Sequence, residues 1–288
     1  MNTQELLKKV RKIEIKTKGL TNQIFSGEYH SAFKGRGMAF SEVREYQVGD
    51  EIRTIDWNVT ARFNNPYVKI FEEERELTVM LLVDVSGSSK LGTHQATKRE
   101  LAAEIAAVLS FSAIQNNDKV GVIFFSDKIE KFIPPKKGKS HILQIIRDLI
   151  NIEPESNKTD IKQALEFFSR VIKKKSTAFI ISDFIAPITY ADVLKISNKR
   201  HDVVALEIND HLEYEFPNVG LLPVKDLETN QIKWVDTSNK KIRTAFKAQA
   251  LKRKHELKEL FRKSGVDHAE IDTEKGYVKP LMNLFKRR

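Results

Sequence analysis

Cysteine is absent from this chain of 288 residues, which excludes a disulfide framework and any metal site built on thiolates. Glycine and proline are few, at 12 and 8 residues, and 41% of the residues are hydrophobic, which is the composition of a globular protein with an ample core. No apolar run approaches the roughly 20 residues that span a bilayer, and the N-terminal "MNTQELLKKVRKIEIKTKGL" lacks the unbroken apolar core of a signal peptide. We therefore expect a soluble, cytoplasmic protein that contacts a membrane at most peripherally.

The net charge is +10, and most of it lies in one segment. Ten basic residues fall within 239–263, opposed only by Glu256 and Glu259. Such a segment suits nucleic acid or an anionic membrane surface. However, its apolar positions keep a helical spacing, which predicts a helix with one packed face and a solvated lysine face; they are Ile242, Phe246, Ala250, Leu257 and Phe261. We favour the packed helix, because no interleaved aromatic platform for bases is visible.

From Leu77 onward, short apolar runs alternate with helical periods. The runs are rich in Val, Ile and Phe, as buried parallel strands are. We predict strands at Leu77–Val85, Lys119–Phe125, Thr177–Ser182, Asp202–Ile208 and Val266–Ile271, and helices at Ala96–Ile114, Ser140–Ile150, Asp160–Ile172 and Tyr190–Asn198. Leu221–Lys225 and Ile232–Asp236 resemble a hairpin added to the same sheet. The expected fold class is α/β, a doubly wound, mostly parallel sheet with helices on both faces.

Residues 1–75 lack the regular alternation of strand and helix patterns seen later in the chain. We predict that they form an N-terminal accessory segment of short strands and turns before a domain at 76–288. Turn signals such as Gly49–Asp50 and Asn64–Asn65–Pro66 are frequent, and "YVKIF" alternates like a strand with one wet face. Arginine and aspartate alternate around a tryptophan here: Arg44, Asp50, Arg53, Asp56, Trp57 and Arg62. We interpret these residues as a clamp of charge-assisted hydrogen bonds, with a partner-docking surface as the alternative.

The stretch "LTVMLLVDVSGSSK" carries the strongest chemical signal. Its apolar run ends at Asp84, and Ser86 and Ser88 alternate in the loop beyond it. In open α/β sheets, ligands bind beyond the carboxyl ends of the strands. An ionised carboxylate with hydroxyl oxygens is a hard, oxygen-only ligand set that suits Mg²⁺, and Mn²⁺ suits the same oxygens.

Two more residues complete the predicted site. Thr159 lies just before the helix "DIKQALEFFSR", and Asp183 ends the strand "TAFIIS", so both are expected at the same sheet edge. Taken singly, each candidate is explained by a helix cap or a loop hydrogen bond, and Thr159–Asp160 is a good capping sequence. Taken together, their order favours a metal site formed by Asp84, Ser86, Ser88, Thr159 and Asp183.

These residues resemble the von Willebrand factor A domain with its metal-ion-dependent adhesion site. In that family the Asp-x-Ser-x-Ser motif, here "DVSGS", supplies serine ligands directly, the threonine also ligates, and the remaining acids often act through water. The resemblance implies an open metal position that takes a carboxylate from a partner protein. Two departures stand out: Asn157–Lys158 precede the threonine where glycine is usual, and Phe184 follows Asp183 where glycine is usual.

A second resemblance covers essentially the whole chain. The stretches "GRGMAFSEVREYQVGDEIRTIDWNVTAR", "PYVKIFEEERE" and "YVKPLMNLF" are similar to a bacterial family catalogued as domain of unknown function fifty-eight. Its members are von Willebrand A-like proteins commonly associated with MoxR-type AAA+ ATPases. The resemblance implies such an ATPase as partner and an adaptor or chaperone-like role.

The expected function is therefore metal-dependent protein binding without catalysis. A competing hypothesis is a Mg²⁺-dependent hydrolase that uses the same acids, but the motif offers no general base. A third hypothesis is nucleic-acid binding through the basic segment 239–263, which predicts an affinity that falls steeply with salt.

Overall fold

The computed structural model describes residues 3–20, 37–63, 65–74, 76–92, 97–225 and 231–288. Its contacts divide the chain into a main unit, Met1–Phe33 with Leu77–Arg288, and a small unit, Lys34–Glu76. Helix α1 (Thr3–Leu20) thus belongs to the main unit, whereas we had placed it in the accessory segment. The physical reason is that Val10 and Ile13 of α1 are buried in the main core. Residues 21–36 of the predicted accessory segment lie outside the described residues.

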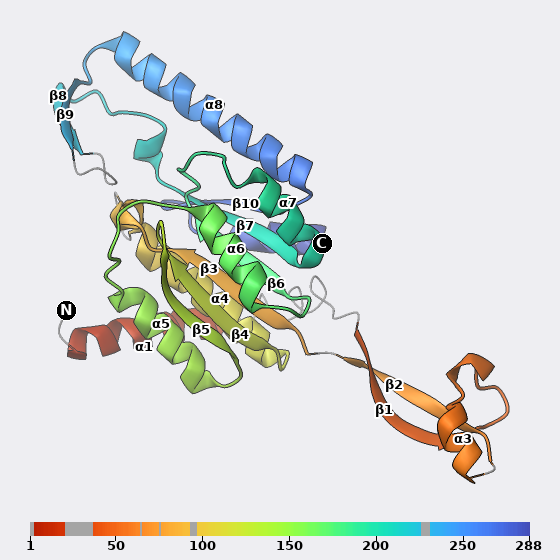
Figure 1. Cartoon of the computed structure of the whole chain (residues 1–288). Coiled ribbons are helices and arrows are strands. Elements are labelled where there is room, and N and C mark those ends of the chain that lie inside the picture. Colours follow the sequence, from red (N-terminus) through yellow and green to blue (C-terminus); the bar gives the residue numbers. More distant parts are fainter. Residues whose placement is uncertain (1–2, 21–36, 64, 75, 93–96, 226–230) are drawn as a thin grey trace. The chain divides into compact units, whose positions relative to one another are not determined.

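The main unit is built on a six-stranded sheet with the strand order β10-β7-β6-β3-β4-β5 (Figure 1). Its strands are β3 (Thr78–Asp84), β4 (Lys119–Phe125), β5 (Ile129–Lys136), β6 (Thr177–Ser182), β7 (Asp202–Asn209) and β10 (Asp267–Asp272). All neighbours are parallel except β4 and β5. The chain runs outward from β3 through β4, then returns to β6 and runs the other way, which places the topological switch point between β3 and β6. The predicted doubly wound, mostly parallel sheet is confirmed.

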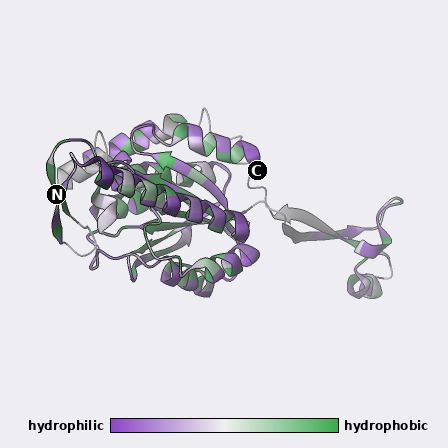
Figure 2. Ribbon diagram, turned by 90° about the horizontal axis from the view of Figure 1, so that it is seen from above, coloured by the Kyte–Doolittle hydropathy of each residue, from purple (hydrophilic) through white to green (hydrophobic). Residues whose placement is uncertain are grey.

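Helices cover both faces of this sheet (Figure 1). One face carries α1, α4 (Lys98–Gln115), α5 (Lys139–Asn151) and α9 (Val278–Arg287), and the other carries α6 (Ile161–Val171), α7 (Ala191–Arg200) and α8 (Lys240–Ser264). Alternation along β3 separates the two cores, because Leu81 and Val83 point to the first face while Leu82 points to the second. Figure 2 shows hydrophilic and hydrophobic residues mixed along the helices, as expected for helices with one buried face.

Two strand assignments differ from the expectation. The sequence did not reveal β5, an antiparallel edge strand that contains Pro134 and Pro135; an edge strand tolerates proline because one row of its main-chain groups needs no partner. The predicted hairpin does form, as β8 (Leu221–Lys225) and β9 (Ile232–Asp236), but it is a separate two-stranded sheet. The hairpin does not extend the six-stranded sheet, whose edges are formed by β10 and β5, and Trp234 remains exposed.

The small unit is an antiparallel hairpin of β1 (Gly37–Glu45) and β2 (Tyr67–Glu74), whose connection contains the short helices η2 (Ile52–Thr54) and α3 (Trp57–Phe63). Arg44 donates two hydrogen bonds of 2.7 Å to the carboxylate of Asp50, and Asp56 accepts from the first-turn N–H groups of α3. The predicted clamp is confirmed for these residues. It is wrong for Trp57, which is 67% exposed.

The basic segment forms α8, which is packed over its C-terminal half. Ala250, Leu257 and Phe261 are buried, whereas Ile242 is 37% exposed and Phe246 stacks on Phe216 at a ring distance of 3.9 Å. The packed face that we predicted is therefore correct toward the end of the helix and wrong at Ile242. Several of its cations already have acidic partners: Lys247 pairs with Glu215, Lys254 and Lys258 with Glu270, and Arg262 with Glu259. Among the described residues, no helix is long and apolar enough to cross a membrane.

Acidification is expected to destabilise the main unit through His201. Its Nδ1 lies 3.0 Å from the Ser176 hydroxyl and its ring contacts Phe168, while its buried Nε2 has no hydrogen-bond partner among the described residues. Burial lowers the pKa of His201 from 6.5 to about 4, with a smaller contribution from Arg200. Since the unfolded chain takes up this proton first, stability falls as the pH falls from about 6.5 toward 4, by about 2–3 kcal/mol.

Urea unfolding of the wild-type protein and His201→Asn between these pH values checks this expectation, because other titrating groups cancel in the comparison. The acid-dependent loss should be smaller in the variant. Identical pH dependence in both proteins would contradict it.

Candidate metal centre

The two predicted acids lie side by side at the switch point of the sheet. Asp84 is the last residue of β3, Asp183 directly follows β6, and these two strands are parallel neighbours. Both side chains are buried, at 6% exposure each. The sequence therefore placed both carboxylates correctly at the edge where an open α/β sheet binds ligands.

Hydrogen bonds hold the Asp84 carboxylate in place. Its Oδ1 accepts from the Ser86 N–H at 2.9 Å, and its Oδ2 accepts from the Ser182 hydroxyl at 2.7 Å. Burial, and next the charge of Asp183, raise the pKa of Asp84 to about 6. A cation at this edge would counter both effects, since it favours the ionised carboxylate.

The serines of the motif lie in the turn that follows Asp84. Ser88 and Ser89 belong to the short helix η3 (Gly87–Lys90), and Ser86 is its N-terminal cap. The hydroxyl oxygens of Ser86 and Ser88 are 3.1 Å apart, while the Ser89 hydroxyl donates to the Ser86 carbonyl at 2.7 Å. Ser86 and Ser88 thus present two adjacent oxygens, whereas Ser89 serves the turn itself.

Thr159 lies in a loop that contacts this turn. The carbonyl of Asn157 accepts from the Gly87 N–H at 3.0 Å, and the Asp160 N–H donates to the Ser126 carbonyl, which follows β4. Asp160, not Thr159, caps α6 by accepting from the Gln163 N–H. Within the described residues the Thr159 hydroxyl makes no hydrogen bond, so the capping explanation of this residue is wrong.

A buried lysine that the sequence analysis missed stands among these residues. Lys98, in the first turn of α4, is 3% exposed, and its ammonium donates to Asp183 Oδ2 at 2.8 Å. It also pairs with Glu213, which approaches from the segment after β7. A lysine is unfavourable at a helix N-terminus because the helix dipole is positive there. That conflict, directly after the capping residue Thr97, is the sequence signal for a buried partner.

The charges of this cluster shift its ionisation. Burial alone lowers the pKa of Lys98, but Asp183 and Glu213 outweigh it, so the pKa of Lys98 is raised. Burial raises the pKa of Asp183, but Lys98 outweighs it and the net shift is downward. The pKa of Glu213 is raised by burial, which Lys98 only partly offsets. Lys98 and Asp183 therefore form an ion pair in which both groups are charged. The charge of Lys98 compensates only part of the cost of burying the Glu213 carboxylate.

Phe184 explains one departure from the von Willebrand pattern. Its φ is +55°, in the left-handed region that favours glycine, which is the usual residue there. Phenylalanine costs roughly 1–2 kcal/mol in this conformation. The ring is 3% exposed and packs edge-on against Phe261 at 5.1 Å, which offsets the strain. The turn after Asp183 is thus kept without glycine.

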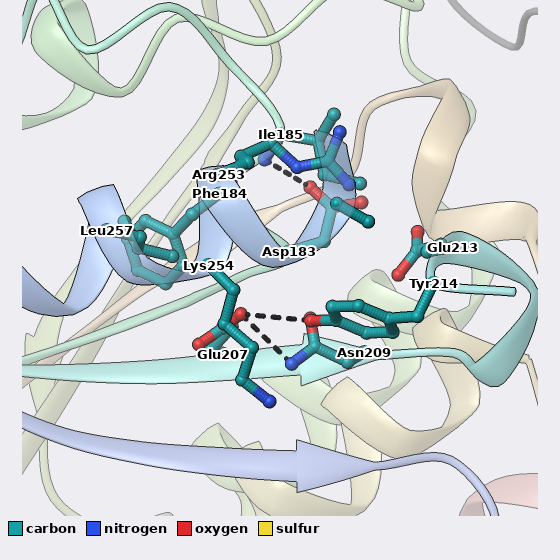
Figure 3. Close-up of a pocket in the computed structure, with 11 residues that line it drawn as sticks. Asp183, Phe184, Ile185, Glu207, Asn209, Glu213, Tyr214, Arg253, Lys254 and Leu257 are labelled. Atoms are coloured by element: carbon teal, nitrogen blue, oxygen red, sulfur yellow. Dashed lines mark hydrogen bonds between the residues drawn. The ribbon is translucent and has the colours of Figure 1, made fainter. Parts of the chain in front are cut away.

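Two small cavities adjoin the acids. One of about 20 Å³ is lined by Asp84, Ser88, Lys98 and Asp183, and it has room for a water molecule or an ion. The other, of about 10 Å³, lies on the α8 side of Asp183. Figure 3 shows this second cavity, where the Glu207 carboxylate accepts hydrogen bonds from the Asn209 amide and the Tyr214 hydroxyl.

The donor set fits a hard divalent cation. The Ser86 and Ser88 hydroxyls share a hydrogen bond of 3.1 Å, and this distance is also compatible with neighbouring ligand oxygens of an octahedral Mg²⁺ site, which lie about 3.0 Å apart for metal–oxygen distances of about 2.1 Å. The carboxylates of Asp183 and Glu213 share the ammonium of Lys98, whereas the Asp84 carboxylate accepts from Ser86 and Ser182 and has no ion pair among the described residues. Because Lys98 and the Ile185 N–H occupy the two oxygens of Asp183, this residue suits a role through water. Metal ligation itself stays a prediction.

Comparisons with known proteins agree with the family resemblance. Residues 42–256 match the family model described as "Protein of unknown function DUF58". The uncharacterized protein Rv1480 of Mycobacterium tuberculosis (strain ATCC 25618 / H37Rv) is 30% identical over 226 residues, which cover 78% of this chain and 71% of that protein.

Solved structures give more distant matches. BatB from Bacteroides thetaiotaomicron aligns with a TM-score of 0.46 and 16% identity over 73% of this chain and 98% of that one. An aerotolerance-related membrane protein from Bacteroides fragilis NCTC 9343 aligns with a TM-score of 0.49 and 17% identity over 74% and 100%, respectively.

Proposed function

We propose that this chain, which belongs to the DUF58 family, is a non-enzymatic adaptor module whose metal centre binds a carboxylate of a partner protein. The observation that carries the proposal is the convergence of Asp84, Ser86, Ser88 and Asp183 at the switch point, beside a cavity large enough for one ion. Thr159 is the fifth proposed ligand residue. We propose Mg²⁺ as the cation, with Mn²⁺ as a substitute, and the cytoplasm as the location.

Each residue has a distinct part in this proposal. Ser86 and Ser88 supply adjacent hydroxyl oxygens, and Asp84 and Asp183 supply negative charge at a fixed position. When bound, the cation would present an open coordination position to an acidic side chain. Lys98 holds Asp183 in its orientation, so that the site is organised before a partner arrives.

The proposed partner is a MoxR-type AAA+ ATPase, on the strength of the family resemblance. The chain itself has no role in nucleotide hydrolysis in this scheme. It would couple the ATPase to a target by binding a carboxylate of one of them, and would do so only with a divalent cation present.

Calorimetric titration with Mg²⁺ and Mn²⁺ tests the metal centre. We expect saturable binding to the wild-type protein, loss of that binding in Asp84→Ala, and wild-type binding in Asp192→Ala, which alters an exposed acid on α7. Circular dichroism establishes that each variant is folded. Equal Mg²⁺ binding by wild-type and Asp84→Ala proteins would sink the proposed site.

A pull-down with the candidate ATPase, with Mg²⁺ or with chelator, then tests the partner. Metal-dependent capture that Asp84→Ala abolishes supports the adaptor role. A screen of phosphate and ester substrates is the matching test of the hydrolase hypothesis, since saturable turnover lost in Asp84→Ala would replace binding by catalysis.

A further inference from the structure

An open sheet edge lies beside a basic groove, remote in sequence from the metal-site motif. Strand β10 ends the six-stranded sheet, and β7 is the one strand that pairs with it in the described part of the chain. The groove has a volume of about 470 Å³ and is lined by β10, by the turn after it, and by α8 and α9. Its charged residues are Lys258, Glu270, Lys275, Lys279 and Arg287.

The free main-chain groups of β10 are the first half of the observation. An edge strand leaves a row of N–H and C=O groups without ladder partners. Within the described residues, the outer edge of β10 receives one main-chain bond, from the Gly276 N–H to the Asp272 carbonyl at its very end. The rest of the strand offers hydrogen-bonding groups to an added strand, which is how extended peptides bind sheet edges.

The charges are the second half. Glu270 is the one carboxylate among the described residues that line the groove, and it already pairs with Lys254 at 2.6 Å and Lys258 at 2.5 Å. In the described part of the chain, Lys275, Lys279 and Arg287 form no ion pair. The groove therefore has an excess of positive charge beside a free strand edge.

Lys279 adds a direct comparison with the metal centre. Like Lys98, it lies in the first turn of a helix, where the helix dipole disfavours a cation. Lys98 is neutralised by Asp183 and Glu213, whereas Lys279 is exposed and has no carboxylate partner among the described residues. An anionic ligand would complement the positive charge that the chain itself leaves uncompensated.

The positions of α8 and α9 determine where along its sequence a bound peptide would need negative charge. α8 packs on one face of the sheet and α9 on the other. Successive side chains of a strand point to opposite faces, so a strand added beside β10 would direct alternate side chains toward Lys258 and toward Lys279. Acidic residues at both odd and even positions are therefore complementary.

We propose that the groove beside β10 binds an extended acidic segment of a partner protein, which pairs with β10 as a seventh strand. Nucleic acid fits less well, because it would leave the strand edge unpaired and the described residues of the groove include no free aromatic ring. His268, the ring that lines it, is held by Glu207 at 2.7 Å and by Phe261 at a ring distance of 4.8 Å.

Fluorescence anisotropy with the full chain and a labelled peptide of about ten residues, rich in Asp and Glu at both odd and even positions, tests the proposal. We expect saturable binding that weakens about tenfold in the double variant Lys275→Glu, Lys279→Glu. The control Lys286→Glu reverses an exposed charge of α9 outside the groove and should change the affinity by less than about twofold.

Two further peptides separate strand addition from simple charge attraction. N-methylation of consecutive residues keeps the charge and removes main-chain donors from both edges of the peptide strand, and it should abolish binding; a neutral Asn and Gln peptide should also fail. Equal binding of the methylated peptide would overturn the proposal. Absence of acidic-peptide binding, or tighter binding of a single-stranded oligonucleotide, would also overturn it. Self-association of the double variant without peptide binding would overturn it as well, because it would show that the lysines serve to prevent pairing between sheet edges.

Discussion

Replacing Lys98 by methionine is expected to destabilise the fold by about 3–5 kcal/mol. The substitution keeps most of the side-chain volume and removes the one ammonium that lies between Asp183 and Glu213. The side chains of Asp183 and Glu213 are only 2% and 9% exposed, so they would lose their counter-charge and gain little contact with water. Urea unfolding followed by circular dichroism at neutral pH measures the loss.

Two comparisons assign that loss to buried charge. Lys128→Met removes an ion pair with Glu155 at a site where the lysine is 43% exposed, and should leave the free energy of unfolding nearly unchanged, because water screens this pair. Adding Glu213→Gln to Lys98→Met removes one of the two unpaired acids, and should recover part of the stability. A Lys98→Met protein within about 1 kcal/mol of wild type would show that this ion-pair cluster does not hold the site together.

The acids of the candidate site were predictable because they depend on a rule of topology. Strand patterns locate the carboxyl ends of β3 and β6, and a doubly wound sheet brings those ends together at its switch point. Asp84 and Asp183 follow from that rule. Lys98 and Glu213 do not follow from it. Lys98 lies at the N-terminus of α4 and Glu213 in the segment after β7, and these two segments reach Asp183 only in the folded chain.

The same distinction holds for the fold. The central strands were predictable from their continuous apolar runs, which only a sheet buried on both faces requires. β5 was not predicted, because the polar and apolar residues of this edge strand alternate only weakly and the strand contains two prolines. The docking of α1 was not predicted, because its buried residues Val10 and Ile13 pack into a core formed by segments after residue 77, which meet α1 only in the folded chain. Elements with strong local patterns were predicted, and elements defined by what they pack against were not.

Phe261→Ala is expected to cost about 3–5 kcal/mol, because it removes a fully buried ring from the core between α8 and the sheet. Phe261 is 1% exposed and contacts both Phe184 and His268. Few residues of α8 are buried, so little else on this long basic helix can compensate for the loss of its largest apolar contact. Urea unfolding measures the change in the free energy of unfolding.

The consequence should reach the metal centre through Phe184. Packing against Phe261 offsets the left-handed backbone of Phe184, which in turn sets the direction of Asp183. Phe261→Ala should therefore weaken Mg²⁺ binding as well as stability, whereas Leu251→Ala, at a position of α8 that is 53% exposed, should change stability by less than about 0.5 kcal/mol and leave metal affinity unaltered. Unchanged Mg²⁺ affinity in folded Phe261→Ala protein would mean that the turn after Asp183 is held by its own hydrogen bonds, from the Phe184 N–H to Ser182 and from the Ile185 N–H to Asp183, rather than by the ring contact.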